Sequence, residues 1–275
     1  MLGALLIVFR EVIEAGLIVG IVLAASHGIP GSKRWIAIGV AGGIAGAALV
    51  ALFAGAISDA FAGAGQEVFN ASVLGLAVVM LTWHNVWMAR HSREIVVELK
   101  SVGEAVTTGQ RPLAALGVVV GLAVLREGSE IVLFLYGVIA AGTSGASVFI
   151  GGICGVLLGA AFSALTYFGL LAIPMRHIFS VTTALIALLA AGMSAQAVQF
   201  LDSAGLVTVL GNQLWDTSGV LSQDSLLGRM LHTLIGYNDR PTQLQLVAYV
   251  STIVVMIALM RLVRPAERPP VTAQI

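Results

Sequence analysis

The chain has 275 residues, of which 58% are hydrophobic and 10% are charged, and its mean hydropathy is +0.99. Soluble domains carry about 25% charged residues, so this composition excludes an ordinary soluble domain and indicates an all-α integral membrane protein in a lipid bilayer. The 14 basic and 14 acidic residues balance. A nucleic-acid partner is therefore not expected, and the position of the charges matters more than their sum.

Seven apolar segments are long enough to cross about 30 Å of hydrocarbon as helices. We expect membrane spans near residues 2–26, 33–58, 67–90, 113–141, 146–173, 177–200 and 243–263. Residues 92–106 mix charged and apolar side chains at helical spacing. This pattern predicts an amphipathic helix that either lies on the membrane surface or extends the third span.

The basic residues assign an orientation to these spans. They gather between spans one and two, three and four, and five and six, and after span seven: Lys33, Arg34, Arg90, Arg93, Lys100, Arg111, Arg176, Arg261, Arg264 and Arg268. The loops between spans two and three and between spans four and five contain none. The positive-inside rule therefore places the N-terminus outside and the C-terminus in the cytoplasm.

Two spans are interrupted by the same charged pattern, Arg-Glu-x-x-Glu. It occupies residues 10–14 in the first span and 126–130 in the fourth. At about 100° per residue, the three charges of each motif share one helix face. Each charge at the bilayer centre costs about 2.5–3.5 kcal/mol on insertion scales, so the two motifs are expected to face each other inside the protein.

We predict that these motifs form a cation site. Its ligands would be Glu11, Glu14, Glu127 and Glu130, with Arg10 and Arg126 balancing part of their charge. Four carboxylates and two guanidiniums leave a formal charge of −2, which one divalent cation neutralises. Carboxylate oxygens favour hard cations over soft ones.

The second motif follows the first by 116 residues, and the same shift superposes Gly39 on Gly155 and Gly43 on Gly159. Because spans one and four run in opposite directions, we expect an inverted 3+3 repeat with one appended helix, which places the site near the membrane midplane. The chain would be one permease domain, residues 1–275. Its expected parts are repeat one (1–90), a cytoplasmic linker (91–112), repeat two (113–200), an outer segment (201–242) and helix seven (243–263).

The outer segment is the largest region expected outside the membrane. Asp224 is predicted to cap a helix from Ser225 to Ile235 that ends at Gly236. The aspartates of this segment either attract cations or a partner, or make ordinary contacts within a solvated loop.

The paired intramembrane motifs resemble those of the oxidase-dependent iron permeases, which include the fungal high-affinity permeases and the bacterial Efe- and Ftr-type permeases. The resemblance extends to Leu81-Thr82-Trp83, Ala190-Ala191-Gly192 and Gly236-Tyr237. It implies that the six charged motif residues are the iron-translocating positions.

The same resemblance implies a multi-pass permease of the bacterial inner membrane. Iron would arrive as Fe²⁺, be oxidised by a periplasmic cupredoxin-like or peroxidase-like partner, and pass inward as Fe³⁺. The protein would be a transporter and not an enzyme, with iron as its substrate and no organic cofactor. Self-association is left open.

The chain departs from the family pattern at the middle of each motif. The usual sequence is Arg-Glu-Gly-Leu-Glu, whereas this chain has Val12-Ile13 and Gly128-Ser129. Some relatives also have a carboxylate where this chain has Asn70, so an outer site there would either depend on Glu67 alone or be absent.

Further polar residues are candidates for the pathway: Glu67, Asn70, His84, Gln196, Gln199 and Asp202. His84 is placed toward the cytoplasmic end of the third span, where it serves either an exit path or hydrogen-bonded packing. Gln196 and Gln199 either line the pathway or bridge helices.

Three other functions are compatible with buried carboxylates. One is a permease for another cation such as Mn²⁺ or Pb²⁺. A second is a carboxylate-bridged iron oxidase, but such sites use Glu-x-x-His and neither motif has a histidine at that spacing. An anion carrier is disfavoured because the carboxylates outnumber the arginines.

Overall fold

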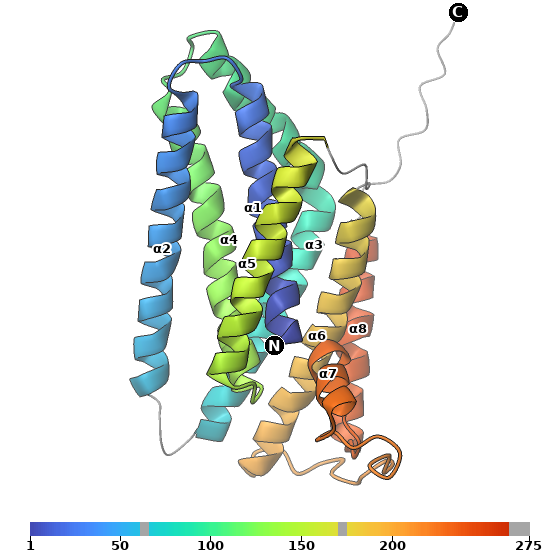
Figure 1. Cartoon of the computed structure of the whole chain (residues 1–275). Helices are drawn as coiled ribbons and strands as arrows, with labels where there is room; N and C mark the ends of the chain where they lie inside the picture. Colours follow the sequence, from blue (N-terminus) through green and yellow to red (C-terminus); the bar gives the residue numbers. More distant parts are fainter. Residues whose placement is uncertain (61–65, 170–174, 264–275) are drawn as a thin grey trace, which may run out of the picture.

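The computed structural model describes residues 1–60, 66–169 and 175–263, which form a helical bundle (Figure 1). The helices are α1 (Leu2–Ala25), α2 (Ser32–Ala60), α3 (Gln66–Thr107), α4 (Ala114–Ala140), α5 (Gly145–Tyr167), α6 (Met175–Ser203), α7 (Leu226–Ile235) and α8 (Gln243–Val263). The short α7 packs on α6 near one end of the bundle, which we call the α7 end. The link between α4 and α5 lies at the same end.

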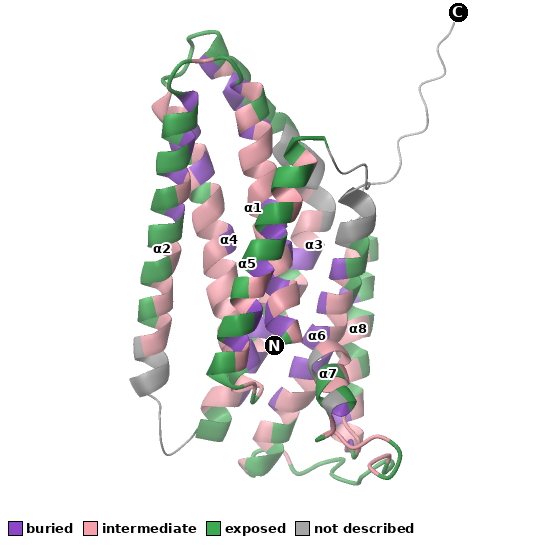
Figure 2. Ribbon diagram, viewed as in Figure 1, coloured by how far each residue is buried: buried purple, intermediate pink, exposed green. Residues whose placement is uncertain are grey.

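Five helices contain segments long and apolar enough to cross a membrane: Ser32–Gly55, Gln66–Met88, Gly145–Tyr167, Ser180–Ser203 and Gln243–Val263. The helices α1 and α4 each carry one charged motif and are not among them. Large apolar side chains such as Leu52, Phe149 and Val254 are exposed, and exposed residues cover the outward faces of α2, α5 and α8 (Figure 2). Such an apolar surface is typical of contact with lipid. The expected all-α, polytopic membrane protein is confirmed.

The third helix is the longest, with 42 residues. It is continuous from the third predicted span through residues 92–106, so the amphipathic segment extends that span and does not form a separate surface helix. Leu99, Val102 and Val106 are buried in one cluster with Val22 and Leu116. This packing explains the apolar spacing of the segment.

Two helix pairs make close contacts at glycines: α2 with α4, and α5 with α1. A Cβ atom added to Gly121 would lie 3.2 Å from the carbonyl oxygen of Gly39, and one added to Gly155 would lie 2.8 Å from that of Leu5. Small residues permit this approach where no hydrophobic effect drives membrane helices together. The two contacts correspond under the 116-residue shift, because Gly39 matches Gly155 and Gly121 matches Leu5.

Two predicted helix ends differ from the structure. The fifth span was expected to reach residue 173, but α5 ends at Tyr167 because Gly169 adopts a left-handed φ of 69°, a common helix terminator. Residues 170–173 lie outside the described residues, as do Arg264 and Arg268, which contributed to the expected orientation.

The cap of α7 is Ser225 and not the predicted Asp224. The Ser225 side chain accepts a hydrogen bond from the N–H of Gly228 at 3.0 Å. The predicted end of α7 at Gly236 is confirmed.

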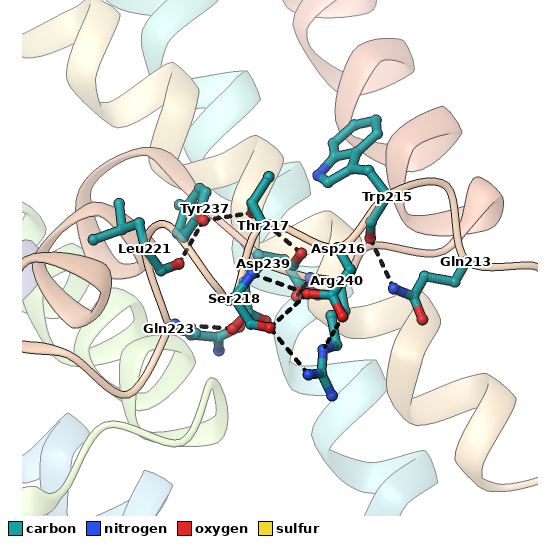
Figure 3. A network of polar contacts seen from close by, with 11 residues as sticks. Gln213, Trp215, Asp216, Thr217, Ser218, Leu221, Gln223, Tyr237, Asp239 and Arg240 are labelled. Atoms are coloured by element: carbon teal, nitrogen blue, oxygen red, sulfur yellow. Dashed lines mark hydrogen bonds and ion pairs between the residues drawn. The ribbon is translucent and has the colours of Figure 1, made fainter.

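A network of polar contacts organises the segment between α6 and α8 (Figure 3). Asp216 accepts hydrogen bonds from Ser218 and lies 3.1 Å from Nε of Arg240. Asp239 accepts from the N–H of Gln223. The Ser218 hydrogen bonds, with the Arg240 guanidinium, hold the pKa of Asp216 below its usual range. These contacts favour ordinary loop chemistry for these two aspartates.

Candidate metal centre

The first motif is buried within α1. The side chains of Arg10 and Glu11 are 2% and 0% exposed, and Glu14 is buried as well. Arg10 Nε lies 2.9 Å from a carboxylate oxygen of Glu14, the i,i+4 pair, and Arg10 Nη1 lies 3.9 Å from Glu11. This arrangement follows from the helical spacing, which puts the three side chains on one face.

The second motif, on α4, is less enclosed. Nε of Arg126 lies 3.2 Å from Glu130 and 3.7 Å from Glu127. The Arg126 side chain is 38% exposed, and its guanidinium lies over the ring of Trp87 at 4.2 Å from the ring centroid. The two arginines thus have different environments, because Arg10 is buried beside carboxylates and Arg126 also lies against an aromatic face.

His84 on α3 joins the two motifs. Its Nε2 atom lies 3.5 Å from Glu14 and 3.9 Å from Glu11, both on α1. Its Nδ1 atom contacts a carboxylate oxygen of Glu130 on α4. The imidazole is buried and meets Phe134 edge-on, with ring centroids 6.5 Å apart. Three helices therefore meet at this one ring.

Four side chains can offer ligand atoms to a common ion. One ligand atom each from Glu11, His84, Glu127 and Glu130 lies within 4.8 Å of the other three. Among the described residues, both carboxylate oxygens of Glu11 and one of Glu127 are buried without a hydrogen-bond partner. Buried polar atoms without partners are costly, and a bound cation would relieve that cost. The donor set, three carboxylates and one imidazole, fits iron among other metals.

The middle residues of the motifs face other helices. Val12 packs against Gly159 of α5, and Gly128 lies against Ala47 of α2. Val12 and Gly128 are equivalent under the 116-residue shift. Both positions lie off the charged face. Gly128 matches the family pattern, and the replacement of its counterpart glycine by Val12 concerns helix packing and leaves the carboxylates in place.

A cavity of about 450 Å³ lies between α2, α3 and α4 at the α7 end. Gln66, Asn70 and Tyr136 are among its lining residues, and Met80 and Leu133 are the lining residues nearest in sequence to His84 and Glu130. Met80 precedes His84 by about one helical turn, and Leu133 follows Glu130 by three residues. The cavity therefore extends from the start of α3 toward the carboxylates.

The other predicted pathway residues lie apart from the motifs. Glu67 and Asp202 are exposed near helix ends, and the cavity wall contains Asn70 but not Glu67. Gln196 and Gln199 line a second cavity of about 220 Å³ between α6, α7 and α8. Gln196 contacts His232, and Gln199 accepts a hydrogen bond from Gln245 at 3.0 Å. For both glutamines, these contacts favour bridging between segments.

Sequence reasoning missed two features of the centre. It assigned His84 to an exit path or to packing, whereas the ring lies between the two motifs. It also assigned no role at the centre to Trp87, whose ring covers Arg126. The available signal was the position of an ionisable residue in an apolar span, which marks a functional candidate by default.

The fold and the centre define a class: a polytopic helical membrane protein that encloses a carboxylate–histidine cluster between its helices. Comparison with known proteins agrees with this class. The model of the iron permease FTR1 family matches residues 1–264. The chain belongs to this family, and its function is iron transport across a membrane.

Curated relatives support the assignment over most of the chain. The "ferrous iron permease EfeU" of Escherichia coli O6:H1 (strain CFT073) is 33% identical over 244 residues, covering 86% of this chain and 87% of its own length. The protein of the same name from Yersinia pestis is 31% identical over 252 residues, covering 89% and 87%. No solved structure gives a significant match.

Proposed function

We propose that iron crosses the membrane through the cluster of the two Arg-Glu-x-x-Glu motifs, with Glu11, Glu14, Glu127 and Glu130 as the acidic groups that receive it. The observation that carries this proposal is the convergence of ligand atoms from both motifs within 4.8 Å. Two copies of a costly charged pattern, 116 residues apart, meet at one point. Separate structural ion pairs would not need to meet.

The proposed architecture is an inverted repeat of α1–α3 and α4–α6, with α8 appended and α1 and α4 as the first and fourth of seven spans. Its support is the matched contact of α2 with α4 and of α5 with α1, which involves equivalent residues of the two halves. We place the protein in the bacterial inner membrane. The positive-inside rule then assigns the α7 end to the outer side and the C-terminus to the cytoplasmic side. Such a design places a substrate site between the halves.

The net charge of the motifs suits a cation that must be bound and then released. Arg10 and Arg126 offset two of the four carboxylates, which leaves −2 for the ion. Without the arginines, four desolvated carboxylates would hold a multivalent cation far more strongly. The net charge of −2 still attracts a cation, and the two arginines lower the affinity enough for the cation to be released.

The cavity between α2, α3 and α4 is the proposed route from outside to the carboxylates. At a rise of about 1.5 Å per residue, α3 spans about 21 Å between Gln66 and Met80 along this wall. An ion reaching Met80 and Leu133 would be one turn from His84 and Glu130. Asn70 and Tyr136 supply polar atoms on the way.

The oxidation state carried is a separate question. The relatives are named for ferrous iron, whereas a carboxylate-rich site also suits the harder Fe³⁺. We propose that Fe²⁺ is supplied and that a periplasmic cupredoxin-like or peroxidase-like partner oxidises it before passage. Flux into proteoliposomes, with Fe³⁺ or with Fe²⁺ kept reduced, separates the two forms. Uptake of Fe²⁺ by the purified protein alone would contradict the oxidase step.

The transport site is tested by replacing its carboxylates one at a time. Glu127→Gln and Glu130→Gln each keep the side-chain size and remove one charge, and each should lower iron uptake by at least about tenfold. Glu98→Gln, at an exposed position of α3, is the matched control and should leave uptake unchanged. Normal uptake by correctly inserted Glu127 and Glu130 variants would exclude the site. Competition with Mn²⁺ and Pb²⁺ in the same vesicles measures its preference among metals.

A further inference from the structure

His84 stands apart from the six charged residues because it contacts both motifs and belongs to neither. We infer that His84 is a ligand of the transported ion and gives the site its preference for iron over alkaline-earth cations. This inference rests on the proposed transport site and adds to it the residue that determines specificity.

The position of the ring supports a ligand role. Its two nitrogens face opposite motifs, Nε2 toward Glu14 and Glu11 and Nδ1 toward Glu130. The ring is buried, and neighbouring α3 residues Ala77 and Leu81 are buried in the core between helices. The imidazole is therefore held at the carboxylates by the packing of α3.

The carboxylate of Glu14 supplies the support that a ligating histidine usually has. Metal-bound histidines turn their second ring nitrogen toward a carboxylate or carbonyl, which fixes the ring orientation. Here Nε2 lies 3.5 Å from Glu14, and Glu14 is itself held by Arg10 at 2.9 Å. Glu14 is also absent from the four side chains that offer ligand atoms to one point. Because Nε2 is oriented by Glu14, Nδ1 is the nitrogen that faces Glu130 and would bind the ion.

The donor chemistry gives the expected preference. Ca²⁺ binds oxygen ligands, six to eight of them, and Mg²⁺ requires octahedral oxygen coordination. Imidazole suits iron, zinc, copper and nickel, whereas carboxylate, carbonyl and water suit Mg²⁺, Ca²⁺ and Mn²⁺. One nitrogen among three carboxylates therefore favours Fe²⁺ without weakening the charge attraction that all divalent cations share.

A purely ionic role for His84 makes a different prediction. A histidine that only balanced charge would alter the affinity of Fe²⁺, Mn²⁺ and Ca²⁺ in the same direction and by similar factors. A ligand would change their ratio. The variant His84→Gln separates the two, because glutamine replaces the nitrogen donor with an amide oxygen at a similar reach.

The experiment measures uptake of iron, supplied as Fe³⁺ and separately as Fe²⁺ kept reduced, and of Mn²⁺ and Ca²⁺ in proteoliposomes of the full chain. For the form of iron that the wild type carries, we expect His84→Gln to lower uptake at least about tenfold, while Mn²⁺ and Ca²⁺ uptake stays within about threefold of the wild type. His27→Gln is the matched control, since His27 is exposed in the turn between α1 and α2, and it should change none of the three. An unchanged ratio of iron uptake to Ca²⁺ uptake in His84→Gln overturns the inference and leaves the transport site standing.

A second measurement has a wild-type arm that does not depend on how well the variant folds. X-ray absorption at the iron edge of the wild-type protein loaded with Fe²⁺ should show the outer-shell scattering of one imidazole, and His84→Gln should lack it. A wild-type spectrum with oxygen ligands alone overturns the inference. Absence of iron uptake by the wild type overturns the transport proposal, and this inference with it.

Discussion

The two arginines should differ in how much they contribute to stability. Arg10 is 2% exposed and its partners Glu11 and Glu14 are buried, so Arg10→Met leaves buried carboxylates without their guanidinium. Breaking a buried ion pair in this way costs about 3–5 kcal/mol. Arg126 is 38% exposed, so its ion pairs are screened and contribute about 1 kcal/mol or less. Its contact with Trp87 adds about 0.5–1 kcal/mol.

These magnitudes translate into melting temperatures of the purified protein in detergent. At about 2–4 °C per kcal/mol for chains approaching this size, Arg10→Met should lower Tm by about 6–20 °C and Arg126→Met by about 1–8 °C. Both are removals of one positive charge from the same cluster, so each serves as the control for the other. An equal or larger loss for Arg126→Met would refute the reasoning from burial.

A divalent cation should restore part of the Arg10→Met loss. Without Arg10 the cluster carries one more negative charge, so its affinity for a cation rises. Binding to the folded state alone stabilises by about 2.7 kcal/mol at one hundred times Kd. Addition of Mn²⁺ should therefore raise the Tm of Arg10→Met more than that of the wild type. An equal rise in both would show that Arg10 lies too far from the ion to influence it.

Two further predictions concern packing and the segment between α6 and α8. Gly155→Leu should lower both Tm and iron uptake, because a Cβ there already meets the backbone of Leu5 at 2.8 Å, whereas Gly152→Leu, with open space around its Cβ, should not; equal effects would exclude close packing of α5 on α1 as the cause. The pKa of Asp216 is lowered by hydrogen bonds from Ser218 and by Arg240, so its contribution to stability is present above the usual aspartate pKa of about 4 and is lost as pH falls below that value. The small Tm difference between wild type and Asp216→Asn should accordingly shrink on acidification, and a difference that grows would contradict this sign.

The sequence was sufficient to predict that residues 10–14 and 126–130 would meet. Charged side chains in apolar spans are costly in contact with lipid, so they are expected to face the protein interior and pair there. It was also sufficient for the bounds of most helices. It could not predict His84 in the cluster, since the face that α3 turns toward α1 and α4 is determined by packing between helices. The end of α5 at Tyr167 and the cap at Ser225 depend on local backbone geometry, where neighbouring residues compete as terminators.

The directions of α1 and α4 give the two arginines different positions along the bundle. Because α1 runs away from the α7 end, Arg10 lies closer to that end than Glu14 does, by about 6 Å of helical rise. Because α4 runs toward the α7 end, Arg126 lies farther from it than Glu130 does, by the same amount. The Cα atoms of the two arginines therefore lie at opposite ends of their motifs, that of Arg10 toward the α7 end and that of Arg126 away from it. The guanidinium of Arg10 reaches Glu14 at 2.9 Å, and that of Arg126 reaches Glu130 at 3.2 Å. Under the proposed transport role, each positive charge therefore lies beside the carboxylates, where it weakens the binding of the ion and favours its release.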